Sequence, residues 1–113
     1  MDKLETYREL LNSTLNKYIE WVNRKAESGV ESYLVSDDEN GHYMWVDWGW
    51  RERRRVKNIN VYARIINDRI WIQEDWTEEG IANELVRAGV PPEDIVRGFQ
   101  PPEMRKYTDF AAA

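Results

Sequence analysis

The sequence of 113 residues contains no cysteine, a single histidine and only four prolines. The absence of cysteine excludes disulfides, thiolate metal ligands and thiol nucleophiles, and it agrees with a reducing compartment. The first residues contain no apolar signal segment, and no stretch approaches the ~20 apolar residues that a membrane-spanning helix needs. We therefore expect a cytoplasmic protein that makes no contact with a membrane.

Residues in recognisable catalytic patterns are scarce. There is no glycine-rich phosphate loop and no serine in a nucleophile-elbow context. The single His42 stands at the start of a predicted strand, where a histidine more often packs or forms a hydrogen bond than binds a metal. The acidic pairs at Glu74–Asp75 and Glu78–Glu79 fit a solvated turn and a charged helix start. We predict no catalytic residues, no metal site and no cofactor.

The composition is that of a folded domain. Hydrophobic residues make up 42% and charged residues 33%, with six Trp and six Tyr among them. These values lie in the globular range, and the length suffices for one ordinary hydrophobic core. We expect a single domain over residues 1–113.

Hydrophobic periodicity predicts a long amphipathic helix over Met1–Lys25, because apolar residues recur there at steps of three and four. Short runs rich in β-branched and aromatic residues then predict strands, separated by turns at Asn40-Gly41 and at Asn67-Asp68. The predicted strands are Val30–Ser36, His42–Trp50, Val56–Ile66 and Arg69–Gln73. Consecutive strands joined by hairpins form an antiparallel meander.

A second helix is expected near the C-terminus. Thr77 is the candidate N-cap, Gly89 the stop signal, and Pro91-Pro92 prevents continuation. Glu93–Val96 is then at most a short helical turn, and the chain after Gly98 is expected to be extended. The predicted fold is α+β, a four-stranded antiparallel meander sheet with the long N-terminal helix and this second helix packed on one face.

Alternation along the strands predicts which side chains face the helices. On each strand, apolar residues at alternate positions are assigned to the helix-facing side. They are Met44, Val46 and Trp48 on the second strand, and Ile59, Val61, Ala63, Ile65, Ile70 and Ile72 on the third and fourth. The opposite face then carries four aromatic residues, Tyr43, Trp45, Tyr62 and Trp71. Tyr and Trp are favoured at protein interfaces, so this face is the candidate protein interface, unless the C-terminal tail covers it.

Charge is distributed unevenly. The formal net charge is −5, but the segment from Arg51 to Lys57 holds five bases and one acid. Its bases, Arg51, Arg53, Arg54, Arg55 and Lys57, form a candidate nucleic-acid contact in a hairpin loop. An acidic chain as a whole repels a phosphate backbone, so we expect such contact to be weak, non-specific and salt-sensitive.

The last third of the chain contains the most distinctive pattern, IANELVRAGVPPEDIVRGF followed by QPPEMRKYTDFAAA. Together with MDKLETYRELL at the start, His42-Tyr43, Gly49-Trp50, Arg55-Val56 and Arg69–Gln73, it resembles the XisI family, the fdxN element excision controlling factors of filamentous cyanobacteria. The resemblance spans nearly the whole chain. Gln100 stands where similar proteins have His before Pro101-Pro102, and Asp75-Trp76 replaces a turn that usually contains Gly.

The resemblance implies an accessory factor, needed together with a protein called XisH when a separate recombinase, XisF, excises a DNA element. We therefore expect a non-enzymatic regulatory protein that acts through an XisH-like partner, with a homo-oligomer also possible and any DNA contact indirect. Two alternatives stay open. One is an accessory module that contacts DNA through the basic hairpin loop, and the other is an inhibitor or antidote of an endonuclease-like partner.

Overall fold

The computed structural model of the chain describes residues 2–25 and 29–113. In chain order its elements are α1 (Lys3–Lys25), β1 (Val30–Asp37), β2 (His42–Arg51), β3 (Arg54–Ile66), β4 (Arg69–Asp75), α2 (Ile81–Arg87), the 3-10 turn η1 (Pro92–Asp94), β5 (Ile95–Val96) and α3 (Pro102–Arg105). The predicted α+β class and the long N-terminal helix are confirmed. Met1, which the predicted helix included, lies outside the described residues. None of the described helices combines the length and the apolar character needed to cross a membrane.

The strands form one five-stranded sheet in the order β1-β2-β3-β4-β5. The first four are an antiparallel meander, as predicted, but β5 adds to β4 in parallel, with Ile70 beside Ile95 and Trp71 beside Val96. The prediction of a four-stranded, fully antiparallel sheet is therefore wrong. Periodicity cannot identify a strand of two residues, and the short helical turn predicted over Glu93–Val96 is present as η1 but ends at Asp94.

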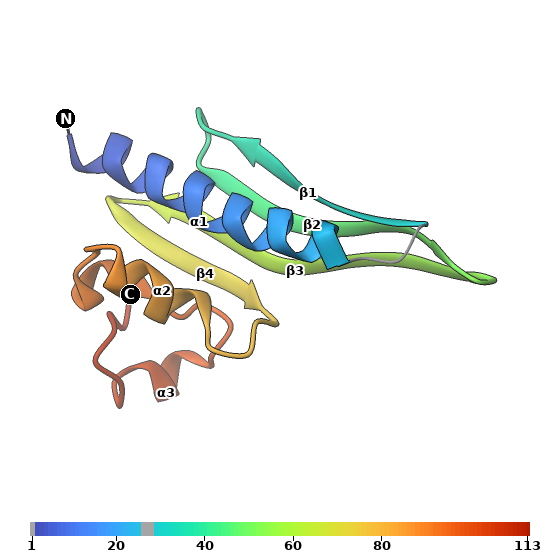
Figure 1. The fold of residues 1–113 in the computed structure, drawn as a ribbon. Helices are drawn as coiled ribbons and strands as arrows, with labels where there is room; N and C mark the ends of the chain where they lie inside the picture. Colours follow the sequence, from blue (N-terminus) through green and yellow to red (C-terminus); the bar gives the residue numbers. More distant parts are fainter. Residues whose placement is uncertain (1, 26–28) are drawn as a thin grey trace.

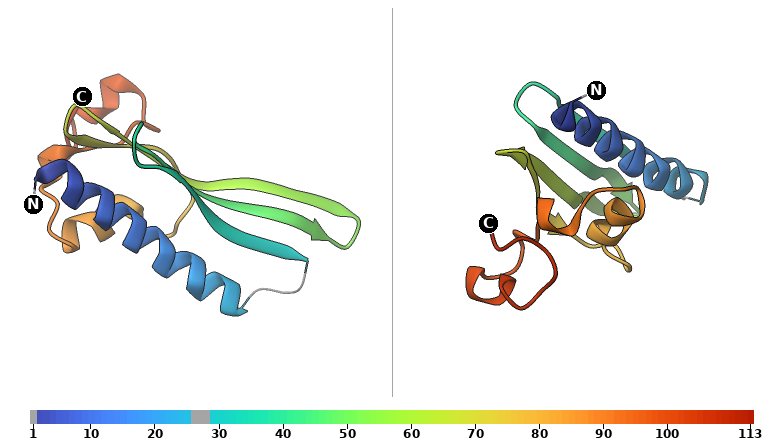
Figure 2. Two further views of the ribbon diagram at one scale, coloured as in Figure 1. Left: turned by 90° about the horizontal axis from the view of Figure 1, so that it is seen from above. Right: turned by 90° about the vertical axis from the view of Figure 1, so that its left-hand side faces the viewer.

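Helices α1 and α2 pack against one face of this sheet, which we call the inner face (Figures 1 and 2). The fully buried side chains of α1 and α2 join those of the strands in one cluster. Its members include Leu11, Leu15, Val61, Ala63, Ile70, Ile72, Ile81, Leu85 and Ile95. A single continuous core is what a chain of this length can support.

Two predicted turns are confirmed by their backbone angles. Gly41 has a φ of 71°, and Asn67 and Asp68 have φ values of 50° and 63°. At Asn67-Asp68, positive φ at both central residues is the geometry of the two-residue turn whose twist matches that of its flanking strands. Asn and Asp tolerate this conformation better than other side chains, so the β3–β4 connection forms without glycine.

The start of α2 differs from the prediction. The helix begins at Ile81 after Gly80, and Thr77 is not its N-cap. The Asp75 carboxylate accepts hydrogen bonds from the Ile81 backbone N–H at 2.7 Å and from the Thr77 backbone N–H at 3.0 Å. A residue at the end of β4 therefore satisfies the first free N–H group of the helix, an arrangement that a capping pattern of adjacent residues does not reveal.

The chain after Gly98 was predicted to be extended, but it is extended only in part. It folds back over β4 and β5. We call residues 97–113 the tail. It contains the short helix α3, and Ala111 forms an isolated bridge with Val96 in which its N–H donates to the Ile95 carbonyl at 2.8 Å. The Arg105 guanidinium of the tail lies 5.3 Å from the centroid of the Trp71 ring, so this part of the tail lies on the face of the sheet opposite to α1, which we call the outer face.

A bulge divides the long hairpin of β2 and β3 in two. The register shifts between Trp45 and Val46, and Asn60 is the extra residue on β3. Pairing of β3 with β4 ends at Val61 and Asp75, so the hairpin continues past the bulge without β4. This projecting part, residues 46–59, we call the arm, and the rest of the molecule the body (Figure 2).

Candidate partner-binding surface

The face assignment of β2 must be corrected. Tyr43 and Trp45, predicted to lie away from the helices, are 0% and 7% exposed and belong to the core. The Trp45 ring stacks on Tyr18 of α1 with centroids 5.7 Å apart. Alternation failed here because both sets of β2 side chains are apolar, so the pattern did not distinguish the inner from the outer face. Neither ring is available to a partner in this structure.

Tyr43 is tied into the core by its hydroxyl group, which donates a hydrogen bond to Asp38 Oδ1 at 2.8 Å. Burial is the main cause that raises the pKa of Tyr43, and the hydrogen bond to the Asp38 carboxylate raises the pKa further. The phenol therefore stays protonated and serves as a structural donor.

The outer face carries the complementary set. Met44 pairs with Tyr62, Val46 with Ile59 and Trp48 with Lys57, so the β2 residues predicted to face the helices point away from them. Ile59, also predicted to face inward, is 45% exposed. The bulge at Asn60 explains this second error, since one extra residue reverses the parity of the strand beyond it.

Tyr62 and Trp71 do lie on the outer face, but they are half-buried. The His42 Nδ1 atom is 2.7 Å from the Tyr62 hydroxyl oxygen, so the single histidine forms a hydrogen bond, as expected. The Arg105 guanidinium of the tail lies 5.3 Å from the centroid of the Trp71 ring. The tail therefore covers part of the surface that was predicted to be an interface, and the interface role of these two residues stays a prediction.

The arm exposes two further aromatic side chains on the outer face. Trp48 is 47% exposed and Trp50 is 53% exposed, and the Arg55 guanidinium lies 4.5 Å and 5.2 Å from their respective ring centroids. Neighbouring apolar side chains extend this surface along β1 and β3, namely Tyr33, Val35 and Ile59. We call these residues with Arg55 the aromatic patch. Sequence reasoning missed Trp48 and Trp50, although their alternation with Asp47 and Gly49 marks them as one face of a strand.

The predicted basic loop is not a loop. β2 and β3 continue through it to the pair Arg51–Arg54, and only Glu52 and Arg53 form the turn. Glu52 has a φ of 58°, which a glutamate adopts rarely, so the sequence contained no turn signal. All five bases, Arg51, Arg53, Arg54, Arg55 and Lys57, are exposed at the far end of the arm. Pairing across the hairpin places Arg55 and Lys57 on the outer face and Arg51 and Arg54 on the inner one.

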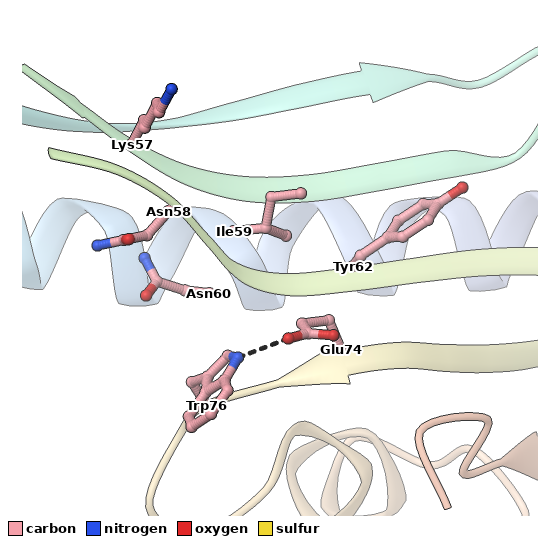
Figure 3. A pocket seen from close by; sticks show the side chains of 7 residues that line it. All are labelled: Lys57, Asn58, Ile59, Asn60, Tyr62, Glu74 and Trp76. Atoms are coloured by element: carbon pink, nitrogen blue, oxygen red, sulfur yellow. Dashed lines mark hydrogen bonds between the residues drawn. The ribbon is translucent and has the colours of Figure 1, made fainter.

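An open groove of about 650 Å³ lies where the arm leaves the body (Figure 3). Its lining comes from β3 on both sides of the bulge, from the end of β4 and from the residue that follows β4: Lys57, Asn58, Ile59, Asn60, Tyr62, Glu74 and Trp76. Trp76 is 75% exposed, and its indole N–H donates to Glu74 Oε1 at 2.7 Å. The groove is thus cationic towards the arm, where Lys57 lies, and anionic towards β4, where Glu74 lies.

The arm and its groove expose aromatic rings, guanidinium groups and backbone hydrogen-bonding groups. Proteins bind other macromolecules through groups of these kinds. Residues 2–25 and 29–113 contain no cluster of three His, Asp or Glu side chains suited to a metal ion. The fold and this surface define a small α+β protein whose outstanding surface feature is a projecting hairpin arm.

The chain belongs to the XisI family, since the family model described as "XisI protein" matches residues 1–112. A crystal structure of a XisI-like protein from Anabaena variabilis ATCC 29413 is 37% identical, with a TM-score of 0.90 over 97% of this chain and 99% of that one. The fdxN element excision controlling factor XisI from the same organism is 36% identical, with a TM-score of 0.83 over 99% of this chain and 100% of that one. A search of curated proteins gave no match.

Proposed function

We propose that this chain is a non-enzymatic accessory factor that controls DNA excision by binding a protein partner, an XisH-like protein. Support comes from the similar crystal structure of an fdxN element excision controlling factor, which covers 99% of this chain. The word "controlling" describes a regulatory role for that relative, and a regulatory protein works through the molecules that it binds.

The aromatic patch on the arm is the observation that carries this proposal. Trp48 and Trp50 lie on a hairpin that projects from the body, and the tail, which covers Trp71, does not extend over them. Trp and Arg are the residues most enriched among those that dominate binding energy at protein interfaces. Desolvating one such ring against a partner contributes about 2 kcal/mol, which is roughly a 30-fold change in affinity.

The test compares two equally exposed tryptophans. Trp50 is 53% exposed beneath Arg55, and Trp21 on α1 is 52% exposed with the Lys25 ammonium 4.4 Å from its ring centroid. Affinity for a purified XisH-like protein is measured by isothermal titration calorimetry for wild type, Trp50→Ala and Trp21→Ala, each first shown to be folded by circular dichroism. We expect Trp50→Ala to bind roughly 30-fold more weakly and Trp21→Ala to bind like wild type.

Two results contradict the proposal. If wild type does not bind the XisH-like protein at micromolar concentrations, the assignment of the partner fails. If Trp50→Ala and Trp21→Ala bind equally well, the patch on the arm is not the binding surface.

A second candidate function is direct DNA contact, and the five exposed cations at the end of the arm favour it. Their guanidinium and ammonium groups can neutralise phosphates without reading the sequence. If the arm binds DNA, replacing Arg53 and Arg54 with Ala should weaken binding to all duplexes alike and reduce its salt dependence. Electrophoretic mobility shifts at several salt concentrations measure this. If the double variant shifts DNA as wild type does, the proposal that the arm contacts DNA is rejected.

A further inference from the structure

Strand β3 is nearly twice as long as β4, one of its two neighbours in the sheet. β3 has 13 residues and β4 has 7, and the last backbone hydrogen bond between the two segments is donated by the Trp76 N–H to the Asn60 carbonyl at 2.9 Å. No described strand pairs with residues 54–59 on that side. The arm is therefore bordered by β1 along β2, and its β3 edge is free over this stretch.

The direction of the backbone groups on this edge follows from the ladder. The Trp50 N–H donates to the Gly29 carbonyl at 2.8 Å, so Trp50 bonds towards the β1 side and its neighbours Gly49 and Arg51 bond towards β3. Their partners on β3 are Val56 and Arg54. Arg55 lies between Arg54 and Val56, and Lys57 follows Val56. Because the direction of the backbone groups alternates along a strand, Arg55 and Lys57 direct their N–H and C=O groups to the free edge.

The same residues place cations along the edge. Arg55 and Lys57 have their side chains on the outer face, next to the unpaired backbone groups. Positively charged side chains on a free strand edge discourage pairing with neutral or basic strands, because the incoming chain must approach the charges. An acidic strand reverses this effect, since its carboxylates neutralise the cations that repel other strands.

The groove of Figure 3 limits which side chains such a strand can have at the end nearest the body. Glu74 and the exposed ring of Trp76 lie there beside Ile59, which favours an apolar residue and opposes a further carboxylate. A complementary segment therefore has acidic side chains opposite Arg55 and Lys57 and an apolar one at the groove. Since alternate residues of a strand share a face, these three positions are spaced two apart.

We infer that the free edge of β3 is a strand-addition site, at which an extended acidic segment of a partner protein pairs with Arg55 and Lys57 in line with β4. This inference rests on the proposed function, because it states how the protein partner is held. Backbone pairing supplies the attraction, and alternate side chains supply the selectivity. The row of unpaired peptide groups favours a peptide over a nucleic acid, which has no matching backbone to offer.

The first experiment uses synthetic peptides and the full-length chain. A fluorescein-labelled peptide of about eight residues, in which three alternate positions are valine, glutamate and glutamate in chain order and the residues between them are threonine, is titrated with protein and followed by fluorescence anisotropy. Two matched peptides serve as controls, one with lysine in place of glutamate and one N-methylated on alternate backbone nitrogens. We expect the acidic peptide to bind and each control to bind at least tenfold more weakly. Failure of the acidic peptide to bind, or equal binding of the N-methylated peptide, overturns the inference.

The second experiment separates the backbone from the charge on the protein side. Lys57→Ala and Lys57→Pro remove the same cation, but only proline removes the N–H that points to the free edge. We expect Lys57→Pro to bind the acidic peptide roughly tenfold more weakly than Lys57→Ala, with both folded by circular dichroism. Equal affinities of the two variants contradict strand addition, and a Lys57→Pro chain that does not fold leaves the N-methylated peptide to decide.

Other occupants of the edge have their own readouts. A wild-type dimer in sedimentation velocity that Lys57→Pro dissociates assigns the edge to a second copy of this chain and overturns the inference. A single-stranded oligonucleotide that displaces the acidic peptide, and binds more tightly than it, does the same in favour of nucleic acid. If the XisH-like protein binds Lys57→Ala and Lys57→Pro equally, the proposed function survives while the edge is excluded. If wild type binds the acidic peptide but not that protein, the edge survives and the assignment of the partner fails.

Discussion

Strands β2 and β3 pass through two environments, and the body and the arm show how the same strands behave in each. In the body, α1 and α2 cover the inner face and the tail covers part of the outer face, so Trp45 is 7% exposed. In the arm, three residues further along β2, Trp48 on the opposite face is 47% exposed. On β2 the body buries Tyr43 and Trp45 in its core, whereas the arm keeps Trp48 and Trp50 accessible, which is the difference expected between core and binding surface.

The largest effect is expected from Trp45→Ala in the body. The change removes the ring that stacks on Tyr18 and leaves a cavity in the core, which costs about 3 to 5 kcal/mol of unfolding free energy. Urea denaturation followed by circular dichroism measures it. Trp45→Phe is the matched control and should cost much less, because it keeps an aromatic ring and the Trp45 Nε1 group has no hydrogen-bond partner in the described residues. A loss below about 1 kcal/mol for Trp45→Ala would place this ring outside the core.

The next effect concerns the point where the arm meets the chain that returns from α1. Gly49 has a φ of 147°, and a Cβ atom there would overlap the Gly29 carbonyl oxygen. Gly49→Ala should therefore cost about 3 kcal/mol, from backbone strain and from the displaced Gly29 peptide. Gly89→Ala is the control, since Gly89 has a φ of 111° but nothing within 4 Å of its Cβ position, and it should lose only about 1 kcal/mol.

Equal losses for the two glycine variants would show that the conformation alone, and not the contact with Gly29, requires glycine at position 49. Thermal denaturation of both variants under identical conditions makes this comparison.

How much of the fold could be predicted from the sequence depended on the length of each signal. The helix over residues 3–25 and the first four strands have long periodic patterns or strong turn residues such as Asn40-Gly41, and they were predicted within a few residues. β5 consists of Ile95 and Val96 alone, too short for any period. The carboxylate that accepts the Ile81 N–H at the start of α2 is that of Asp75, which lies six residues before Ile81 and belongs to a strand. Such features become visible only when the chain is folded.

The candidate surface was predicted in part, for a reason that lies in the composition of β2. Both faces of that strand are apolar, so the choice between Trp45 and Trp48 could not be made from alternation and was made wrongly. The accumulation of cations near residue 53 was visible, but the turn at Glu52-Arg53 lacks turn-forming residues, and the end of the arm between Trp50 and Val56 was therefore predicted as a loop. Hydrophobic pattern identifies a strand readily, but the side that is buried is decided by the helices that pack on it.

A smaller effect is expected at Asp94, which links α1 to the strand β5 in the body. Its carboxylate accepts hydrogen bonds from the Tyr7 hydroxyl and from the Lys3 ammonium, the latter at 2.8 Å. Burial raises the pKa of Asp94, but the bonds from Lys3 and Tyr7 outweigh burial and hold the pKa below its ordinary value. Asp94→Asn should cost about 2 kcal/mol at neutral pH.

The pH dependence of this link has a defined sign. A carboxyl group whose pKa is lower in the folded state stabilises the fold above its unfolded pKa of about 3.9, and this contribution is lost as the pH falls through the folded value. The difference in unfolding free energy between wild type and Asp94→Asn should therefore shrink as the pH falls below about 4, in urea titrations at a series of pH values. A difference that stays constant over that range would mean that the charge of Asp94 does not stabilise the body.

The smallest effect on stability is expected from Trp48→Ala in the arm, and it sharpens the comparison most. Trp48 is on the same strand as Trp45, but it contacts solvent on one side and the Arg55 guanidinium, 4.5 Å from its centroid, on the other. Losing this exposed cation–π contact costs about 0.5 kcal/mol, several times less than the loss expected for Trp45→Ala. Urea denaturation and partner titration on the same two proteins then give opposite orders. Trp45→Ala should be the more destabilised, and Trp48→Ala the weaker binder while still fully folded. If Trp48→Ala instead loses as much stability as Trp45→Ala, the arm is part of the core, and the division of this sheet into a stable body and a binding arm is wrong.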